Sequence, residues 1–193
     1  MVGGTRRGQP KEPGSVLFAG RFVEKKNIPA LLSAMARLVR EGKAVTLYLA
    51  GDGPLRPELE SLVTQLGIER RVRFLGWLER DALLARIAAS ELVIFCSHGS
   101  EGMPMVILET LRTDSLLVAA PQRFTDSYDL RPCGAIYLED DSSEQIAAGI
   151  IGGLERGVSV EELLARDTFM LNFSPERVRD EFLALYRSVL AMA

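Results

Sequence analysis

Two glutamates stand eight positions apart in the segment EGMPMVILE, residues 101–109, and carboxylates placed in this way can act on one ligand. Glu101 lies in a Ser/Gly-rich loop, whereas Glu109 lies in an apolar run that is typical of a helix. Gly102 and Pro104 favour a turn into that helix, because Pro suits the first helical turn and has no N–H to leave unpaired. The segment therefore predicts one wall of a polar pocket. The alternative is a capping acid and a solvated helix glutamate, and this segment alone leaves both open.

Cations gather in a second segment, GRFVEKK at residues 20–26, which follows an apolar run and leads into a helix. Arg21 offers a planar fork for phosphate oxygens, and Lys26 offers a mobile point charge. Together with the N–H groups of the next helix, they suit a diphosphate. The alternative is a solvated basic loop, which the segment taken alone slightly favours.

Other kinds of site fit the sequence poorly. GDGPLR at residues 51–56 starts like a dinucleotide fingerprint, but it lacks the third glycine, has Pro where the helix begins and follows the second strand. A glycosidase-like pair is disfavoured, because neither Glu101 nor Glu109 is obviously placed to have a raised pKa and a hydrolase needs no cations opposite the pair. His98 is the only histidine, which excludes a His-based triad or a multi-His metal site within this chain. For His98 a loop-ordering role is favoured over a ligand contact, and for Cys96 packing is favoured over nucleophilic attack.

Short β-like runs alternate with amphipathic segments from Ser15 onward. The expected strands are residues 16–19, 45–50, 72–75, 92–95, 116–119 and 135–138, and the expected helices are 28–39, 55–66, 81–89, the segment that carries Glu109, 142–155 and 175–190. Asn27 is expected to cap the first helix. The pattern predicts a Rossmann-like, three-layer α/β/α domain with a mainly parallel six-stranded sheet. Ligands bind at the carboxyl ends of such strands, where segments 21–26 and 97–104 both fall.

Length, composition and net charge limit the classes of protein that this sequence can encode. A chain of 193 residues with 47% hydrophobic content can bury one full core, and a net charge of −3 does not suggest a nucleic-acid partner. Two cysteines fit a reducing cytosol, and no apolar run approaches a bilayer span. Residues 1–14 are expected to be a disordered leader or linker, residues 15–170 the Rossmann-like domain, and residues 171–193 a C-terminal helix.

Four motifs in order resemble a known family. They are Gly-Arg-x4-Lys at residues 20–26, Leu-x-Leu-Ala-Gly-Asp-Gly-Pro at 47–54, Val-x-Phe-Leu-Gly at 72–76, and Glu-Gly-x-Pro-x-Val-x-x-Glu at 101–109. The chain resembles retaining glycosyltransferases of the GT-B fold, and most closely the bacterial group related to glycosyltransferase family 4, also called group 1. The resemblance covers about residues 16–155 and extends to the last helix.

The resemblance implies roles for the polar residues. Arg21 and Lys26 would hold the donor diphosphate, with Gly20 beside it, and Glu109 would accept hydrogen bonds from the ribose hydroxyls, which suits an acceptor-only carboxylate. Glu101 would lie near the donor sugar and phosphates, so Arg21, Lys26 and Glu101 form the expected catalytic set.

Other positions follow from the same resemblance. The main-chain N–H groups of Gly102, Met103 and Met105 would face the phosphate or sugar, and the loop at Trp77 would position the base. Fixed cations at the leaving group give a reason for such enzymes to work without a metal, and neither a metal nor a cofactor is expected.

Two departures from the family pattern stand out. Asn27 replaces a frequent Gly. Thr113-Asp114-Ser115 and residues 121–129 replace small-residue and Gly-Gly segments of a loop that often borders the donor sugar, which puts donor choice or activity in question.

The resemblance covers one half of a GT-B enzyme, the nucleotide-sugar-binding half. The expected function is donor binding in the transfer of a hexose from a UDP- or GDP-sugar to a glycan or lipid-linked acceptor, with no activity in this half alone. The expected partners are the nucleotide sugar and an N-terminal acceptor-binding domain, and the expected location is cytoplasmic, with room for a peripheral contact at the inner face of the membrane through the other half. A non-catalytic nucleotide-sugar-binding or interaction module is the alternative, and a GT-B phosphorylase or epimerase is a weaker one.

Overall fold

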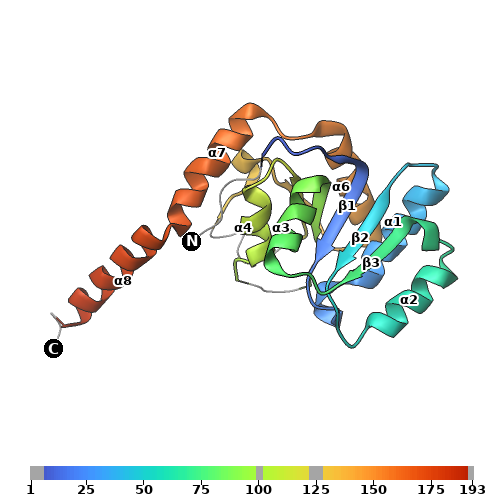
Figure 1. Ribbon diagram of the computed structural model, residues 1–193, viewed down its shortest axis with the longest axis horizontal. Helices are drawn as coiled ribbons and strands as arrows, with labels where there is room; N and C mark the ends of the chain where they lie inside the picture. The colour runs from blue at the N-terminus through green and yellow to red at the C-terminus, as the bar shows by residue number, and fades with distance from the viewer. Residues whose placement is uncertain (1–6, 99–101, 122–127, 191–193) are drawn as a thin grey trace.

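The computed structural model of the protein describes residues 7–98, 102–121 and 128–190 (Figure 1). In these residues six strands form one sheet in the order β3-β2-β1-β4-β5-β6, and every neighbouring pair is parallel. The strands are β1 (Glu12–Ala19), β2 (Thr46–Ala50), β3 (Val72–Gly76), β4 (Ser90–Phe95), β5 (Leu116–Ala119) and β6 (Ile136–Tyr137). This arrangement confirms the Rossmann-like sheet. The direction of strand order reverses between β1 and β4, which is where such sheets open a crevice for ligands.

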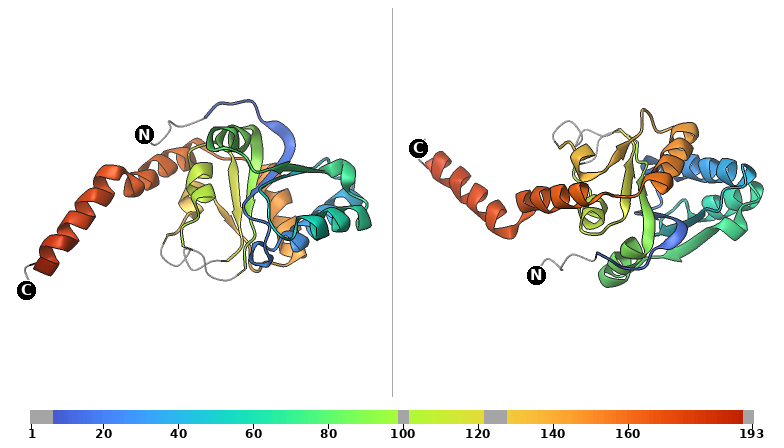
Figure 2. Two further views of the ribbon diagram at one scale, coloured as in Figure 1. Left: turned by 60° about the horizontal axis from the view of Figure 1, so that its bottom comes forward. Right: turned by 90° about the horizontal axis from the view of Figure 1, so that it is seen from above.

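Helices cover both faces of the sheet and make it the middle of three layers (Figures 1 and 2). The helices are α1 (Ile28–Arg40), α2 (Arg56–Gln65), α3 (Arg80–Ala89), α4 (Met105–Leu111), α6 (Ser143–Arg156), α7 (Val160–Met170) and α8 (Pro175–Leu190). Side chains alternate along the strands, so that Val16 and Phe18 pack with α1, α2 and α6, whereas Leu17 packs on the opposite face with Ile87 of α3. Helix α4 covers β5 on that second face.

Strand β1 begins at Glu12, inside the segment that was expected to be a leader. Glu12 pairs with Ser90 of β4, and the pairing register shifts between Glu12 and Val16. Gly14 takes φ +70° in this irregular stretch, where a β-carbon would lie 2.0 Å from the carbonyl oxygen of Ala44. The Pro-Gly pair therefore marks a bulge within a strand and not a loop, and the expectation of a disordered leader is wrong for residues 11–14.

Helix α7 is absent from the predicted elements. It starts with a capping box, in which the Ser159 hydroxyl accepts from the main-chain N–H of Glu162 and the Glu162 carboxylate accepts from that of Ser159. The Ser-x-x-Glu spacing was the signal that could have found it. Helix α8 has the predicted bounds and extends away from the body of the domain (Figures 1 and 2). Large apolar side chains stand exposed along it: Val178, Phe182, Leu183, Leu185 and Tyr186.

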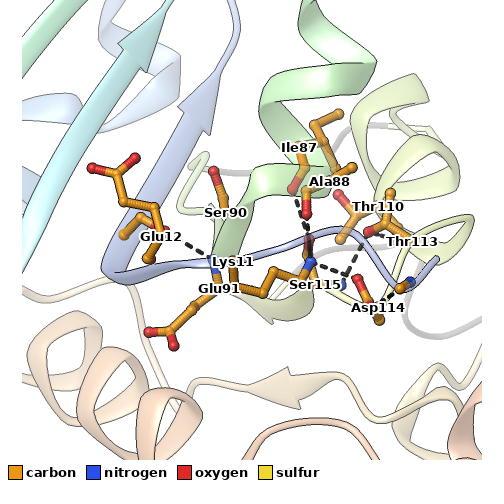
Figure 3. Close-up of polar contacts among 12 residues, drawn as sticks. Lys11, Glu12, Ile87, Ala88, Ser90, Glu91, Thr110, Thr113, Asp114 and Ser115 are labelled. Atoms are coloured by element: carbon orange, nitrogen blue, oxygen red, sulfur yellow. Dashed lines mark hydrogen bonds and ion pairs between the residues drawn. The ribbon is translucent and has the colours of Figure 1, made fainter. Parts of the chain in front are cut away.

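A network of polar residues closes the amino-terminal edge of the sheet (Figure 3). The Lys11 ammonium donates to the carbonyl of Ala88 and to the hydroxyl of Ser115, each at 2.7 Å, and lies 2.6 Å from a carboxylate oxygen of Asp114. The Ser115 hydroxyl in turn donates to the carbonyl of Ile87 at 2.7 Å. This network ties residues before β1 to the segment between α4 and β5.

The fully buried Arg166 of α7 holds the same segment. Its guanidinium donates to the carbonyls of Thr113 at 2.8 Å, Ser115 at 2.9 Å and Cys133 at 2.8 Å. Burial lowers the pKa of Arg166 to about 10, so the side chain stays charged at neutral pH. Thr113-Asp114-Ser115 therefore lies at the edge of the sheet opposite to the carboxyl ends of the strands. The expectation that these three residues border the donor sugar is wrong, because they precede β5 and do not follow it.

Candidate functional site

A cavity of about 240 Å³ opens at the carboxyl ends of the first three strands. Its walls come from the ends of β1, β2 and β3, from α3 and from the first two turns of α4. The lining residues are Ala19, Gly20, Ala50, Gly51, Trp77, Leu78, Leu83, Met105, Val106 and Glu109. The predicted site residues Gly20, Trp77, Met105 and Glu109 are thus brought together. Leu78, Leu83 and Val106 were not predicted, because apolar lining residues look like core residues in a sequence.

The floor of the cavity depends on the glycines of residues 51–53. Gly51 takes φ +143°, and a β-carbon on it would lie 1.9 Å from the carbonyl oxygen of Gly20. A β-carbon on Gly53 would lie 2.5 Å from the carbonyl oxygen of Phe22. The N–H of Phe22 also donates to the carbonyl of Asp52 at 2.9 Å. The glycines of residues 51–53 therefore pack against the turn that begins the cationic segment 20–26. This structural role agrees with the rejection of a dinucleotide fingerprint at residues 51–56.

The cationic segment borders this cavity. Arg21 is exposed next to the lining residue Gly20, and Lys26 ends the 3-10 turn Glu24–Lys26. The Lys26 side chain lies along Gly20, since a β-carbon there would be 3.6 Å from its Cε. The Lys26 ammonium lies 5.3 Å from the centre of the Phe95 ring. A partly buried ammonium beside the cavity is suited to an anion, because its charge is less screened than it would be in bulk water.

Asn27 stands before α1, but its side chain does not cap that helix. Its backbone has φ 52° and ψ 33°, the left-handed conformation that Gly and Asn tolerate best. Its side-chain amide donates to the carbonyl of Asp141 at 2.8 Å. Asn27 is therefore the N-cap residue of α1, as predicted, but without a side-chain capping hydrogen bond, and its backbone conformation gives a reason for either Gly or Asn at this position.

Glu109 lies on α4 with its side chain at the cavity and only 8% of its surface exposed. Burial raises the pKa of Glu109, and the nearby Arg80 and Arg112 partly oppose this effect. The expectation that Glu109 has no raised pKa, which was one of two arguments against a glycosidase-like pair, is therefore wrong. As a buried acceptor with two lone-pair-bearing oxygens, its ionised carboxylate can receive hydrogen bonds from two adjacent hydroxyls.

The remaining predicted residues lie around the cavity mouth. Trp77 is 74% exposed and Met105 is 60% exposed, so both present apolar surface to a ligand. Gly102 is exposed, whereas Met103 packs against the hydrophobic cluster under α4, and neither lines the cavity. Their predicted main-chain contacts stay predictions. Glu101 lies outside the described residues, as does most of the segment 121–129.

His98 and Cys96 follow β4 at the same edge of the sheet. The main-chain N–H of His98 donates to the carbonyl of Lys25 at 2.7 Å, and its Nδ1 contacts a carboxylate oxygen of Asp141. The Cys96 thiol donates to the carbonyl of Lys26 at 3.3 Å, and burial raises its pKa to about 12. Cys96 is therefore a packed thiol and not a nucleophile at neutral pH. The described residues include no group of three or more His, Cys, Asp or Glu side chains placed to hold a metal ion.

The fold and the site together define a Rossmann-like α/β domain, with its cavity at the carboxyl edge of a parallel sheet and beside a cationic turn. The family model described as glycosyl transferases group 1 matches residues 5–154. The chain belongs to this glycosyltransferase family.

Relatives share its sequence over different lengths. The chain is 36% identical over 104 residues to the α-D-kanosaminyltransferase of Streptomyces kanamyceticus, an alignment that covers 54% of the chain and 27% of that protein. It is 32% identical over 189 residues to the lipopolysaccharide core biosynthesis glycosyltransferase LpsE of Rhizobium meliloti, covering 93% of the chain and 51% of LpsE. The aligned residues thus span about half the length of LpsE and about a quarter of the kanosaminyltransferase.

Solved structures share the fold. The Anabaena protein Alr3699/HepE, solved in complex with UDP and glucose, aligns with a TM-score of 0.79 at 22% identity, covering 91% of this chain and 48% of that one. The sucrose-phosphate synthase of Thermosynechococcus elongatus aligns with a TM-score of 0.80 at 21% identity, covering 96% of this chain and 47% of that one. These neighbours are GT-B glycosyltransferases, so the architecture is that of one half of a GT-B fold. In the described part of the chain no helix has the length and apolar character that crossing a membrane requires.

Proposed function

We propose that this domain binds the donor of a retaining glycosyltransferase, which transfers a hexose from a UDP- or GDP-sugar to a glycan or a lipid-linked acceptor. The observation that carries the proposal is the position of Glu109, a buried carboxylate that lines a cavity beside Lys26. In this arrangement Glu109 accepts from the ribose hydroxyls while Arg21 and Lys26 hold the diphosphate. Trp77 covers the base at the cavity mouth. The family membership and the fold shared with a UDP-bound protein support the same ligand class.

The chemistry follows from where charge develops. When the glycosidic bond to the donor phosphate breaks, negative charge grows on the departing nucleoside diphosphate. Cations that are already in place stabilise this charge without reorganising during the reaction. We propose that Arg21 and Lys26 supply this stabilisation without a metal. Losing one of them would slow transfer on the order of 100-fold or more, as losses of other preorganised donors do.

Trp77 allows a direct binding test. It is the only tryptophan in the sequence and lines the cavity, so ligand binding should change its fluorescence. Titrating the chain with UDP and with GDP, by fluorescence and by calorimetry, should show saturable binding of at least one and thereby select the base. Glu109→Gln and Arg21→Ala should each weaken binding at least tenfold, because each removes a charged hydrogen-bond partner.

Arg70→Ala is the matched control for Arg21→Ala. Arg70 is exposed in the turn Glu69–Arg71, which precedes β3 and so lies at the opposite edge of the sheet. It should leave binding unchanged. If neither nucleotide binds, or if both site variants bind as tightly as Arg70→Ala, the proposed function is wrong.

A non-catalytic module would also bind the nucleotide, so a second experiment distinguishes such a module from the donor-binding domain of an enzyme. We propose that transfer needs an N-terminal acceptor-binding half, that the domain alone is inactive, and that the enzyme works in the cytoplasm, with any membrane contact made by the other half. Joining the chain to such a half from a relative and assaying UDP- and GDP-sugars should give transfer that Arg21→Ala abolishes. Nucleotide binding without transfer by any such fusion would favour the non-catalytic module. That alternative rested on the altered segment 113–129, and its first part, Thr113–Ser115, lies away from the cavity.

A further inference from the structure

The pair His98 and Asp141 joins three segments at the rim of the site. Nδ1 of His98 contacts Oδ2 of Asp141, and a carboxylate only accepts, so Nδ1 carries the hydrogen. The main-chain N–H of His98 donates to the carbonyl of Lys25 at 2.7 Å. The main-chain carbonyl of Asp141 accepts from the side chain of Asn27 at 2.8 Å. The pair therefore connects the end of β4, the cationic turn and the loop before α6.

The imidazole keeps a second polar atom for another partner. With Nδ1 engaged by Asp141, Nε2 is the ring nitrogen left to face a ligand, and 52% of the His98 side chain is exposed. The contact of Asp141 with Nδ1 fixes the ring orientation, and a protonated imidazole held in this way donates from Nε2.

The surrounding charges identify the kind of ligand that this donor would meet. Lys25 and Lys26 stand on the cationic turn, and Lys26 lies along Gly20 of the cavity wall. Asp141 is the carboxylate on the loop that faces His98, and the thiol of Cys96, two residues before His98, stays neutral because burial raises its pKa to about 12. On the segment of His98 itself, the next charged residue is Glu101, which lies outside the described residues. His98 and the cationic turn are thus adjacent at the edge of the sheet where an anionic diphosphate would bind.

We propose that His98, held by Asp141, is a titratable contact for the donor diphosphate, so that protonation of its imidazole tightens nucleotide binding. This inference rests on the proposed function and adds to it a residue that the four sequence motifs do not contain. Protonated His98 donates Nδ1–H to Asp141 and Nε2–H to a phosphate oxygen. Deprotonation removes one donor and one charge, and the diphosphate then keeps Arg21 and Lys26.

The test uses the chain without a histidine tag, because His98 is then its only histidine. The affinity for UDP and GDP is measured for the native protein and for His98→Gln at about pH 5.5 and at about pH 8, which bracket the range where histidine gains its proton. The phosphate of the nucleotide also titrates near pH 6, and comparing the two proteins at each pH cancels that contribution. We expect the native protein to bind about tenfold more tightly than His98→Gln at the lower pH, as the loss of one charged hydrogen bond implies. At the higher pH the two should agree within about twofold.

Two controls distinguish a phosphate contact from a general effect on the fold. The nucleoside without phosphates should bind both proteins equally at both pH values. In proton NMR, the midpoint of the single imidazole titration should move up by about one pH unit when the nucleotide saturates the site, because coupling between proton and ligand is reciprocal. Asp141→Asn should reduce the pH-dependent difference at least by half, since the ring loses the carboxylate that accepts from Nδ1 and fixes its orientation.

Each outcome bears on the proposal. A His98→Gln loss that is equal at both pH values, or that extends to the nucleoside, would mean that His98 only orders the loop, and it would overturn the proposal while leaving the donor site intact. An imidazole midpoint that does not move on saturation would overturn it as well. A native chain that binds neither nucleotide at either pH would instead refute the donor site itself, and His98 with it.

Discussion

Gly51 meets the main chain of Gly20 so closely that a β-carbon at residue 51 would lie 1.9 Å from the Gly20 carbonyl oxygen. This contact joins the ends of β2 and β1 directly beneath the cavity. It is reinforced by the Gly20 N–H, which donates to the carbonyl of Ala50 at 2.9 Å. The shape of the cavity therefore depends on two residues without side chains.

Gly51→Ala should unfold or distort this contact. The φ of +143° and the clash with backbone together predict a loss of about 3 kcal/mol or more in the free energy of unfolding. Urea denaturation followed by circular dichroism measures it. Gly152→Ala, in α6 with open space around its α-carbon, is the control and should be neutral or slightly stabilising. Equal effects of the two substitutions would contradict the close packing of β1 and β2.

Glu109→Gln should have opposite effects on the stability of the protein and on its affinity for the nucleotide. Burial raises the pKa of Glu109 in the folded protein above its ordinary value of 4.5. Between the two values the folded state holds more protons than the unfolded state, so the contribution of Glu109 to stability falls as the pH rises through that window. Gln has no such penalty. We therefore expect a higher urea midpoint for Glu109→Gln at pH 7 than for the native protein, together with weaker nucleotide binding.

The pH series checks the sign of this effect. The stability advantage of Glu109→Gln should shrink as the pH is lowered from the raised folded-state pKa to about 4.5, and it should be lost below that, where the native carboxyl is protonated in both states. A lower midpoint for the variant at pH 7 would show that the ionised carboxylate is stabilised by Arg80 and Arg112 more than it is penalised by burial.

Arg166→Ala should be one of the most damaging substitutions outside the cavity. It leaves the carbonyls of Thr113, Ser115 and Cys133 without their donor in a buried place. Breaking buried charged contacts of this kind costs about 3–5 kcal/mol. Thr168→Ala, on the exposed side of the same helix, is the control and should change stability by less than about 0.5 kcal/mol. A loss below about 1 kcal/mol for Arg166→Ala would mean that water replaces the guanidinium.

Asp114→Asn should make the protein less stable at neutral pH but not in acid. Burial alone would raise the pKa of Asp114, but the contacts from Lys11 and from the N–H of Gly8 outweigh it and leave the pKa below the ordinary value of 3.8. Stability from this group is therefore present above that value and is lost as the pH falls through the folded-state pKa. Since Asn leaves the half-buried Lys11 without its counter-charge, we expect a loss of about 2 kcal/mol at pH 7.

Urea midpoints at pH 7, at pH 4 and at about pH 2.5 check this dependence. The difference between Asp114→Asn and the native protein should nearly vanish at the lowest pH. Asp180→Asn provides the control, because its pair with Arg179 is exposed on α8 and should show little effect at any pH. A difference that persists in acid would indicate that hydrogen-bond geometry, and not charge, holds the segment.

Much of the fold could be predicted because its signals are local. Apolar runs bounded by glycine mark the strands, and the helical spacing of apolar residues marks α1, α6 and α8. The location of the site followed from the same information, since residues after parallel strands meet at one edge. For that reason the segments 21–26 and 97–104 could be placed at one edge before their contacts were known, whereas Trp77 and the role of Glu109 followed from the family resemblance.

Other features depend on pairings between distant segments. Lys11 meets Asp114, and Arg166 meets Thr113, across more than fifty residues in each case. Local sequence made Pro13-Gly14 look like a loop and made Thr113–Ser115 look like part of the site. Both interpretations failed because strand pairing and buried hydrogen bonds outweigh local preference.

The sequence by itself determined that a parallel α/β sheet presents cationic and acidic motifs at one edge, because strand and helix periodicity and chain direction are properties of contiguous residues. Only the tertiary structure decided which residues lie within reach of one another there. In the folded protein Glu109 is buried, His98 contacts Asp141, and Thr113–Ser115 lies at the edge of the sheet opposite to the cavity. These outcomes depend on how closely separate segments pack and on which buried polar groups need a hydrogen-bond partner from a distant segment.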